Sequence, residues 1–260
     1  MPFLSVVPAG NRKLWTVMNL INIDSVKLSC KSCSLAELCL PRRLSPEDLV
    51  KFEEIVTQKS PIPKGGTLYR SGQPAHALYA IKSGALKSVV TTEDGEEQIV
   101  GFHMPGELVG FDGVESTYTC TVVSLDRSSV CELPLKDIET LAQQVPGLHR
   151  EVCSIMRREI SQEQSMLLLL ARRTAESRLA SFLVSLAGRL GSRGFSRNEF
   201  NLVMSRHDIA NYLGLAAETV SRLISKFQEL GIIEVDRRRV IILNREALNR
   251  KAGNTAQKSA

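Results

Sequence analysis

The chain has 260 residues, of which 43% are apolar and 23% charged, a composition typical of globular proteins and large enough for one or two real cores. Its longest apolar stretch, residues 166–171, is far too short to cross a bilayer, and residues 1–15 lack the basic start and apolar core of a signal peptide. We therefore expect a cytoplasmic protein with no membrane partner.

The net charge of +5 is unevenly distributed along the chain. Residues 170–260 hold 16 Lys and Arg against 8 Asp and Glu, whereas residues 1–169 hold 17 against 20. This asymmetry indicates a C-terminal module that binds a polyanion, attached to a part with a different task.

The first half of the chain predicts a short helix followed by strands. Residues 1–29 show no period and read as a loosely ordered extension. Residues 44–56 predict a helix, because Ser45 can cap it and Pro46 suits its first position. From residue 61 to 135, short runs of β-forming residues alternate with glycine-bearing turns, which predicts a small antiparallel sandwich or roll.

Two helices are predicted after the roll. Residues 137–171 are helical in pattern, and the helix over 175–191 ends in glycine. Coiled-coil-like spacing places one set of residues on a single stripe of the first helix, namely Met156, Ile160, Glu163, Leu167 and Leu170. Glu163 is the acidic member of this otherwise apolar stripe.

Residues 206–233 read as a helix, a tight turn and a second helix. Ala210 is small where the two helices must cross, Gly214 can supply a left-handed turn, and Val220 can bury the second helix against the first. Residues 231–243 predict a hairpin with an arginine-rich turn, which gives a winged helix-turn-helix.

On this interpretation the second helix enters the major groove of double-stranded DNA. Its exposed candidates for base contacts are Glu218, Ser221 and Arg222, because Arg can donate to guanine and Glu can accept from cytosine. Thr219 and Arg206 are expected to hold the DNA backbone. The alternative for Glu218 and Arg222 is an ordinary salt bridge on a solvated helix face.

Cys30, Cys33 and Cys39 lie within ten positions, and three explanations compete for them. A zinc site usually has two close pairs of ligands, and only one C-x2-C pair is present. A disulfide is disfavoured in a reducing compartment. An iron–sulfur cluster tolerates uneven spacing and can take a fourth thiolate from elsewhere, and spacing does not choose among Cys120, Cys131 and Cys153.

Several motifs together closely resemble the Crp/Fnr family of transcription regulators, in particular its fumarate and nitrate reduction regulators. They are the cysteine spacing and the stretches PIPKGGTLYRSG, LYAIKSGALK, GEEQIVGFHMPGELVGFD, SVCELP, MLLLLARRTAESRLASFL and ANYLGLAAETVSRL. The resemblance extends from about residue 28 to residue 245.

The resemblance implies an α+β fold with three functional regions. These are a β-roll sensor domain of the cupin-like jelly-roll type, a long dimerisation helix and a C-terminal winged helix-turn-helix, expected over residues 30–147, 148–172 and 173–245. Residues 1–29 would form a flexible N-terminal extension and residues 246–260 a C-terminal tail.

The resemblance also implies a cofactor and its ligands. Such regulators bind an oxygen-labile 4Fe-4S cluster, and Cys30, Cys33 and Cys39 match three ligands while Cys131 matches the fourth. Cys120 and Cys153 match no ligand position and read as buried or incidental thiols, with Cys120 as a minor alternative ligand. A plain thiol redox switch or a zinc site remains the alternative use of these cysteines.

The implied function is that of an oxygen-responsive regulator and not an enzyme. It would form a homodimer when the cluster is intact, with Glu163 opposing contact otherwise, and would bind palindromic DNA with TTGAT half-sites through Glu218, Ser221 and Arg222. The acidic residues 91–98 match a surface that contacts RNA polymerase.

Residues 106–122 offer no basic residue for a phosphate, so cyclic nucleotides are not expected. Haem is not expected either, because His76 and His103 read as satisfied surface or core residues and not as haem ligands.

Overall fold

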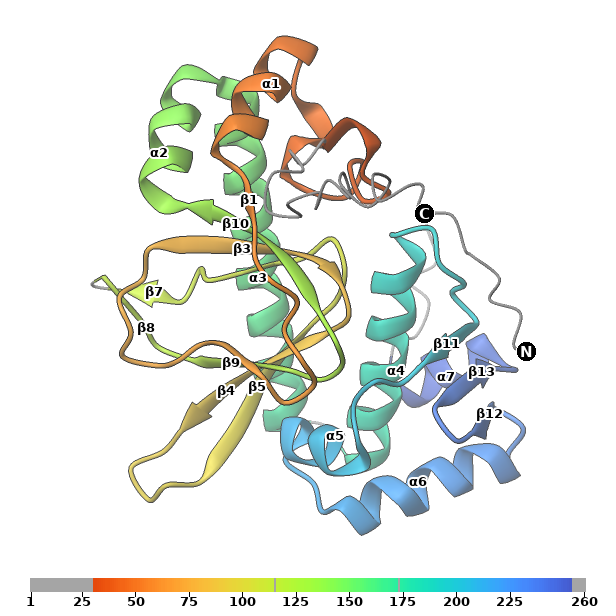
Figure 1. The fold of residues 1–260 in the computed structure, drawn as a ribbon. Helices are drawn as coiled ribbons and strands as arrows, with labels where there is room; N and C mark the ends of the chain where they lie inside the picture. Colours follow the sequence, from red (N-terminus) through yellow and green to blue (C-terminus); the bar gives the residue numbers. More distant parts are fainter. Residues whose placement is uncertain (1–29, 115, 173, 254–260) are drawn as a thin grey trace, which may run out of the picture.

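Two four-stranded antiparallel sheets pack face to face in the N-terminal part of the chain (Figure 1). The structure is a computed structural model, and it describes residues 30–114, 116–172 and 174–253. The predicted extension over residues 1–29 and the end of the predicted tail lie outside these residues. None of the helices in the described ranges is long and apolar enough to span a membrane.

The sheets have the strand orders β1-β10-β3-β6 and β2-β9-β4-β5, and a small ribbon pairs β7 with β8. This arrangement confirms the predicted antiparallel roll. The strands are β1 (Thr57–Gln58), β2 (Thr67–Tyr69), β3 (Ala77–Ser83), β4 (Leu86–Thr91), β5 (Glu97–His103), β6 (Leu108–Val109), β7 (Gly113–Val114), β8 (Thr117–Tyr118), β9 (Thr121–Ser124) and β10 (Ser129–Pro134).

Strand β3 is buried on both faces, because it separates two apolar cores. Tyr79 and Ile81 point between the sheets into one core, whereas Leu78 and Ala80 point outward into a second core. This alternation follows from the two-residue period of a strand. The outward core is the one that carries the cysteines.

A layer of helices covers the outward face of the β3 sheet. Phe52, Ile138, Leu141 and Leu148 pack there against the sheet. Ser45 accepts a hydrogen bond from the Asp48 amide and caps the first of these helices, as predicted. The layer consists of η2 (Cys30–Ser32), η3 (Leu40–Arg43), α1 (Pro46–Ile55), α2 (Leu135–Gln144) and the first turns of α3 (Pro146–Arg172).

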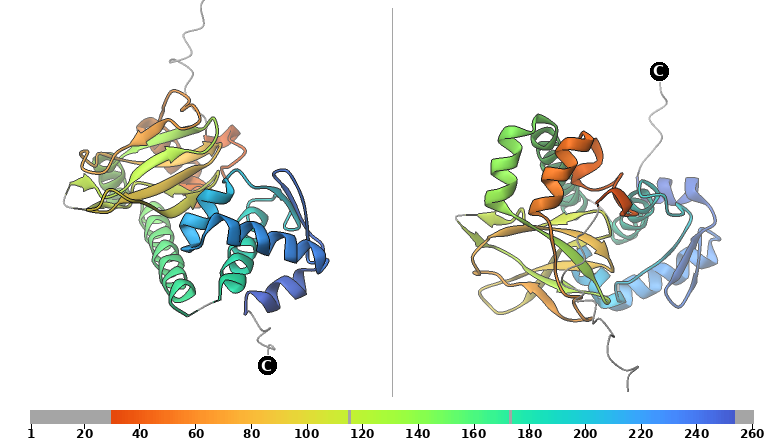
Figure 2. Two further views of the ribbon diagram at one scale, coloured as in Figure 1. Left: turned by 90° about the horizontal axis from the view of Figure 1, so that it is seen from below. Right: turned by 45° about the horizontal axis from the view of Figure 1, so that its top comes forward.

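Helix α3 leads from this layer to the C-terminal part of the chain, and α4 (Ala175–Gly191) returns beside it. Figure 2, left, shows that α3 and α4 lie close together at one end and diverge toward the other. The side chain of Thr174 accepts a hydrogen bond from the amide of Ser177 and so caps α4. The predicted helix over 175–191 is confirmed.

The C-terminal part is a winged helix-turn-helix. A capping box of Ser205 and Asp208 starts α5, and Gly214 ends it in the left-handed conformation with φ 61°, which glycine adopts without a steric penalty. Ala210 and Val220 are buried between the helices, as expected. The elements are β11 (Glu199–Asn201), α5 (Arg206–Leu213), α6 (Ala217–Glu229), β12 (Ile233–Asp236), β13 (Arg239–Ile242) and α7 (Arg245–Lys251).

Two features differ from the sequence-based boundaries. Strand β11 adds a third strand to the wing hairpin. Helix α7 packs onto the domain through the fully buried Leu248 and Ala252, so the unit does not end at residue 245 and the segment from residue 246 is not simply a tail. Seven residues are too few for a clear helical period, which is why the pattern did not show α7.

Ion pairs hold the roll against the C-terminal part. Glu107, after β5, lies 2.5 Å from Arg189 and 2.6 Å from Arg193 of the segment around the end of α4. Lys87 of β4 lies 2.7 Å from Asp208 of α5. The Glu107 pairs fix the end of α4 against the roll, and the Lys87–Asp208 pair fixes α5 there.

Replacing Glu107 tests this interface. Burial raises the pKa of Glu107, but Arg189 and Arg193 outweigh it and hold that pKa below its ordinary value of 4.5. The carboxylate therefore stabilises the fold above pH 4.5, and this contribution is lost as the pH falls through the lowered pKa. Glu107→Gln should lower the free energy of unfolding at pH 7 by about 3–5 kcal/mol. The free energy of unfolding of this variant should also change less than that of the wild type between pH 3.5 and 7, as measured by urea unfolding.

The matched control is Glu199→Gln, which removes an exposed partner of Arg239 and should leave the unfolding midpoint unchanged. Equal effects of the two substitutions would contradict the assignment of stability to the Glu107 pairs.

Candidate metal centre and nucleic-acid interface

Four cysteines from distant parts of the sequence line one pocket. Cys30, Cys33 and Cys39 come from the segment before α1, and Cys131 comes from β10. The strand register fixes Cys131 between Gln58 of β1 and Ala80 of β3. Because Cys131 belongs to the outward core, its thiol faces the cysteine-bearing segment.

The cysteine-bearing segment is folded onto the helical layer by its own contacts. Glu53 of α1 accepts hydrogen bonds from the backbone amides of Cys30 at 2.5 Å and Lys31 at 3.3 Å. The amide of Cys39 donates to the Leu35 carbonyl at 3.0 Å. Leu35 is buried at this site, so the protein itself positions the thiols.

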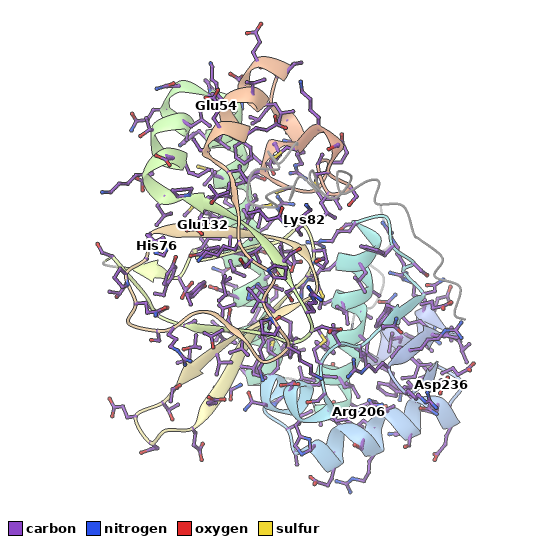
Figure 3. The ribbon with its side chains drawn as sticks, in the orientation of Figure 1. Glu54, His76, Lys82, Glu132, Arg206 and Asp236 are labelled. Carbon is purple, nitrogen blue, oxygen red and sulfur yellow. The ribbon has the colours of Figure 1, made fainter. Side chains whose placement is uncertain are left out.

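The walls of the pocket are apolar apart from Lys82. Burial raises the pKa of the Cys30 and Cys39 thiols to about 12 and raises that of Cys131. Lys82 opposes this increase for Cys30 and Cys131. Figure 3 labels Lys82 at the edge of the roll, and Lys82 lines the pocket together with the cysteine-bearing segment. The other lining residues are Leu35, Ala36, Pro41, Phe52, Val56, Ala80, Ile81 and Leu133.

The remaining cysteines lie elsewhere. Cys120 is buried in the roll, where its amide donates to Asp112 at 2.8 Å. Cys153 lies on α3 with its sulfur 3.7 Å from Nε2 of His149. Neither thiol lines the pocket of Cys131. In the described part of the chain, no three His, Cys, Asp or Glu side chains converge closely enough to hold a single metal ion.

A second pocket lies inside the roll and faces α3. Its polar lining includes Ser88, His103, Asp112 and Glu159, and its described lining contains no Lys or Arg. His103 is partly buried, its Nε2 lies 2.8 Å from Ser88 Oγ, and burial lowers its pKa to about 4. Burial also raises the pKa of Glu159.

His76 lies at the surface of the roll beside Glu132, and Figure 3 labels both. Its Nε2 lies 3.2 Å from the Glu132 carboxylate and 3.3 Å from the Tyr79 hydroxyl. Both histidines thus have protein partners, as the sequence suggested.

The predicted dimerisation stripe is uncovered on α3. Met156, Ile160 and Leu167 are 45%, 52% and 69% exposed, which is high for large apolar side chains. Glu163 is exposed on the same helix, and Leu170 is partly buried. The structure therefore presents the stripe as an open surface of the single chain.

Helix α6 separates a buried face from an exposed one. Val220, Ile224 and Phe227 are buried. Glu218, Ser221 and Arg222 are exposed. Arg222 Nη2 lies 3.4 Å from Thr219 Oγ1, and within the described residues no ion pair joins Arg222 to Glu218. The salt-bridge interpretation is therefore wrong for this structure.

Arg206 does not lie on the free surface that its predicted backbone contact requires. Together with Lys64, Lys87, Arg237 and Arg238, it lines a cleft between the roll and the wing. Its Nη1 is buried without a hydrogen-bond partner, and burial lowers its pKa. The reason is that α5 packs on the roll; Figure 3 labels Arg206 near the start of this helix.

The packing of α5 depends on Asn211, which the sequence did not single out. Its side chain accepts from the amide of Ile99 at 2.6 Å and donates to the carbonyl of Glu97 at 2.7 Å. These bonds extend the edge of β5 in the manner of a neighbouring strand.

Comparisons with known proteins agree with this architecture. Residues 177–251 match the model of the Crp-like helix-turn-helix domain, and residues 59–145 match that of the cyclic nucleotide-binding domain. The FixK2 structure from Bradyrhizobium japonicum has 29% sequence identity and a TM-score of 0.71, covering 78% of this chain and 100% of that chain.

Two curated relatives are closer in sequence. The transcriptional activator protein anr of Pseudomonas aeruginosa is 47% identical over 86% of this chain and 92% of its own. The fumarate and nitrate reduction regulatory protein of Escherichia coli K12 is 41% identical over 92% of this chain and 96% of its own. These relatives are regulators of transcription and not enzymes. With its roll, long helix and winged helix-turn-helix, the chain belongs to the Crp/Fnr family of transcription regulators.

Proposed function

We propose that the protein is an oxygen-responsive regulator of anaerobic genes that binds a 4Fe-4S cluster through Cys30, Cys33, Cys39 and Cys131. The observation that carries this proposal is the single pocket in which three clustered thiols meet Cys131 of a distant strand. The names of the relatives support it, because fumarate and nitrate serve as electron acceptors when oxygen is absent.

The chemistry of the pocket fits such a group. Metal ligation requires thiolates, yet burial disfavours the thiolate forms of Cys30 and Cys39. A bound cationic iron core would compensate this cost, and Lys82 adds a further positive charge at the pocket. When bound, the cluster would supply a redox-active group that oxygen can oxidise.

The arrangement favours a cluster over the two alternatives. A structural zinc site usually has two close pairs of ligands, whereas here only Cys30 and Cys33 form a C-x2-C pair and Cys131 comes from a distant strand. A plain thiol switch works best with a readily ionised cysteine, whereas burial raises the pKa of Cys30, Cys39 and Cys131.

The apolar stripe of α3 supports a homodimer. Two copies of the stripe would bury Met156, Ile160 and Leu167 but would also bring the two Glu163 carboxylates together. Like charges in a partly desolvated groove oppose contact. We therefore propose that the dimer forms only when the intact cluster favours it.

The exposed face of α6 supports DNA recognition in that dimer. Two recognition helices presented one helical turn apart would read a palindromic site. We propose TTGAT half-sites, with Glu218, Ser221 and Arg222 at the bases and Thr219 near the backbone. Arg206 would reach the backbone only if α5 moved away from the roll.

Other parts of the chain receive roles within this proposal. Asp112 and Glu159 make the roll pocket unfavourable for a phosphate, so we propose that cyclic nucleotides are not ligands. The exposed acidic turn between β4 and β5 would contact RNA polymerase. Residues 30–147 would sense, residues 148–172 would dimerise, and the DNA-binding unit would extend from residue 173 through α7. We place the protein in the cytoplasm, where DNA is accessible.

Two cysteine substitutions test the cluster. In chain purified without oxygen, we expect a brown protein with about four irons per chain. Cys131→Ser should lose most of this iron, whereas the control Cys120→Ser should retain it, because Cys120 lies outside the pocket. Iron analysis and the visible absorption spectrum measure both. A colourless wild-type protein, or iron loss in Cys120→Ser alone, would contradict the proposal.

Replacing Glu163 tests the control of dimerisation. Glu163→Ala removes the repulsion at the seam and should lower the dimer dissociation constant in air by about tenfold or more. DNA binding in air should appear with it, as measured by sedimentation and by fluorescence anisotropy on a labelled TTGAT palindrome. Glu139→Ala, which removes an exposed charge from α2, should change neither. A Glu163→Ala variant that stays monomeric in air would contradict this mechanism.

A further inference from the structure

An ion pair joins the cysteine-bearing segment to the long helix. Helix η3 begins directly after Cys39, and the Arg42 amide donates to the Cys39 carbonyl at 3.2 Å. Arg42 Nη2 lies 2.6 Å from Oε1 of Glu151, in the second turn of α3. Arg42 thus lies one helical turn after Cys39, the last cysteine of the segment.

Glu151 depends on this partner because it is almost inaccessible to water. Its side chain is 2% exposed, and a carboxylate withdrawn from water must be paired. Arg158 and Arg43 lie farther away, at 3.3 Å and 3.9 Å, and both are more than half exposed. Arg42 is therefore the closest and least exposed of the three partners.

Packing reinforces the same connection. Leu40 of η3 is fully buried in the same apolar cluster as Val145, Leu148 and the partly buried Val152, and η3 contacts α3. Helix η3 therefore packs against the first turns of α3. Met156 and Ile160 of the dimerisation stripe follow Glu151 by about one to three turns of the same helix, so a displacement at Glu151 reaches the stripe.

Building on the proposed function, we infer that the Arg42–Glu151 pair transmits the state of the four-thiol pocket to the dimerisation helix. While Cys39 is held in the pocket, η3 keeps Arg42 on Glu151. Release of Cys39 frees η3 and leaves Glu151 with Arg158 as its nearest partner. The first turns of α3 must then rearrange to restore pairing or solvation of the carboxylate, which displaces the stripe.

Arg42→Gln tests the inference in the full chain, prepared with and without iron in the absence of oxygen. The measured quantity is the ratio of the dimer dissociation constants of the iron-free and iron-loaded forms, obtained by sedimentation. For the wild type we expect a ratio of about 5 to 150. Arg42→Gln should retain the iron content and visible spectrum of the wild type, while its ratio falls close to one.

Arg43→Gln is the matched control, because it removes the same charge from the next residue, whose side chain is mostly in water. It should keep the wild-type ratio. Arg42→Lys preserves the charge and should restore most of the ratio, which a purely structural role of the arginine would not predict. Glu151→Gln removes the partner on α3 and should reproduce the effect of Arg42→Gln.

Hydrogen–deuterium exchange of the wild-type chain tests the inference without any substitution. Removing iron should increase exchange in residues 40–43 and 146–156 together. An iron-loaded Arg42→Gln protein with the wild-type ratio, an Arg43→Gln protein with an equal loss, or unchanged exchange in residues 146–156 would overturn the inference. A wild-type dimer constant that does not depend on iron would instead overturn the proposed function itself.

Discussion

The gathering of four partly buried cysteines in one apolar pocket on the outward face of one sheet is the constraint that organises the proposed site. A buried thiol resists ionisation, and burial raises the pKa of Cys30 and Cys39 to about 12. Such a site is poor at forming free thiolates but suited to a ligand that brings its own positive charge. The same burial that would make a cluster stable therefore also makes its loss consequential for the surrounding packing.

The double burial of β3 connects this site to the rest of the molecule. One face of the strand builds the core of the roll and the other supports the cysteine pocket. A shift in the pairing of β3 with β10 would therefore disturb the core of the roll as well as the position of Cys131. The helical layer then joins the pocket to α3 through Leu40 and the Arg42–Glu151 pair. From α3 the chain leads to α4 and the helix-turn-helix, and Figure 2 shows this succession of elements.

Much of this architecture could be predicted from sequence because local chemistry specifies it. Ser45 and Gly214 mark helix ends through a cap and a left-handed turn, which short-range patterns reveal. Contacts between distant residues have no such signal. The pairing of Asn211 with the edge of β5, the cleft around Arg206 and the burial of Glu151 depend on tertiary packing. Helix α7 was missed because its burial against α4 stabilises a segment too short to show a period.

Sedimentation of the wild-type chain before and after exposure to air tests the central claim most directly. The iron-loaded protein kept without oxygen should sediment as a dimer, and admission of air should convert it to a monomer as the visible absorption of the cluster disappears. DNA affinity should fall in parallel, because only the dimer presents two recognition helices. A protein that loses its visible absorption in air but remains a dimer with unchanged DNA affinity would contradict the account.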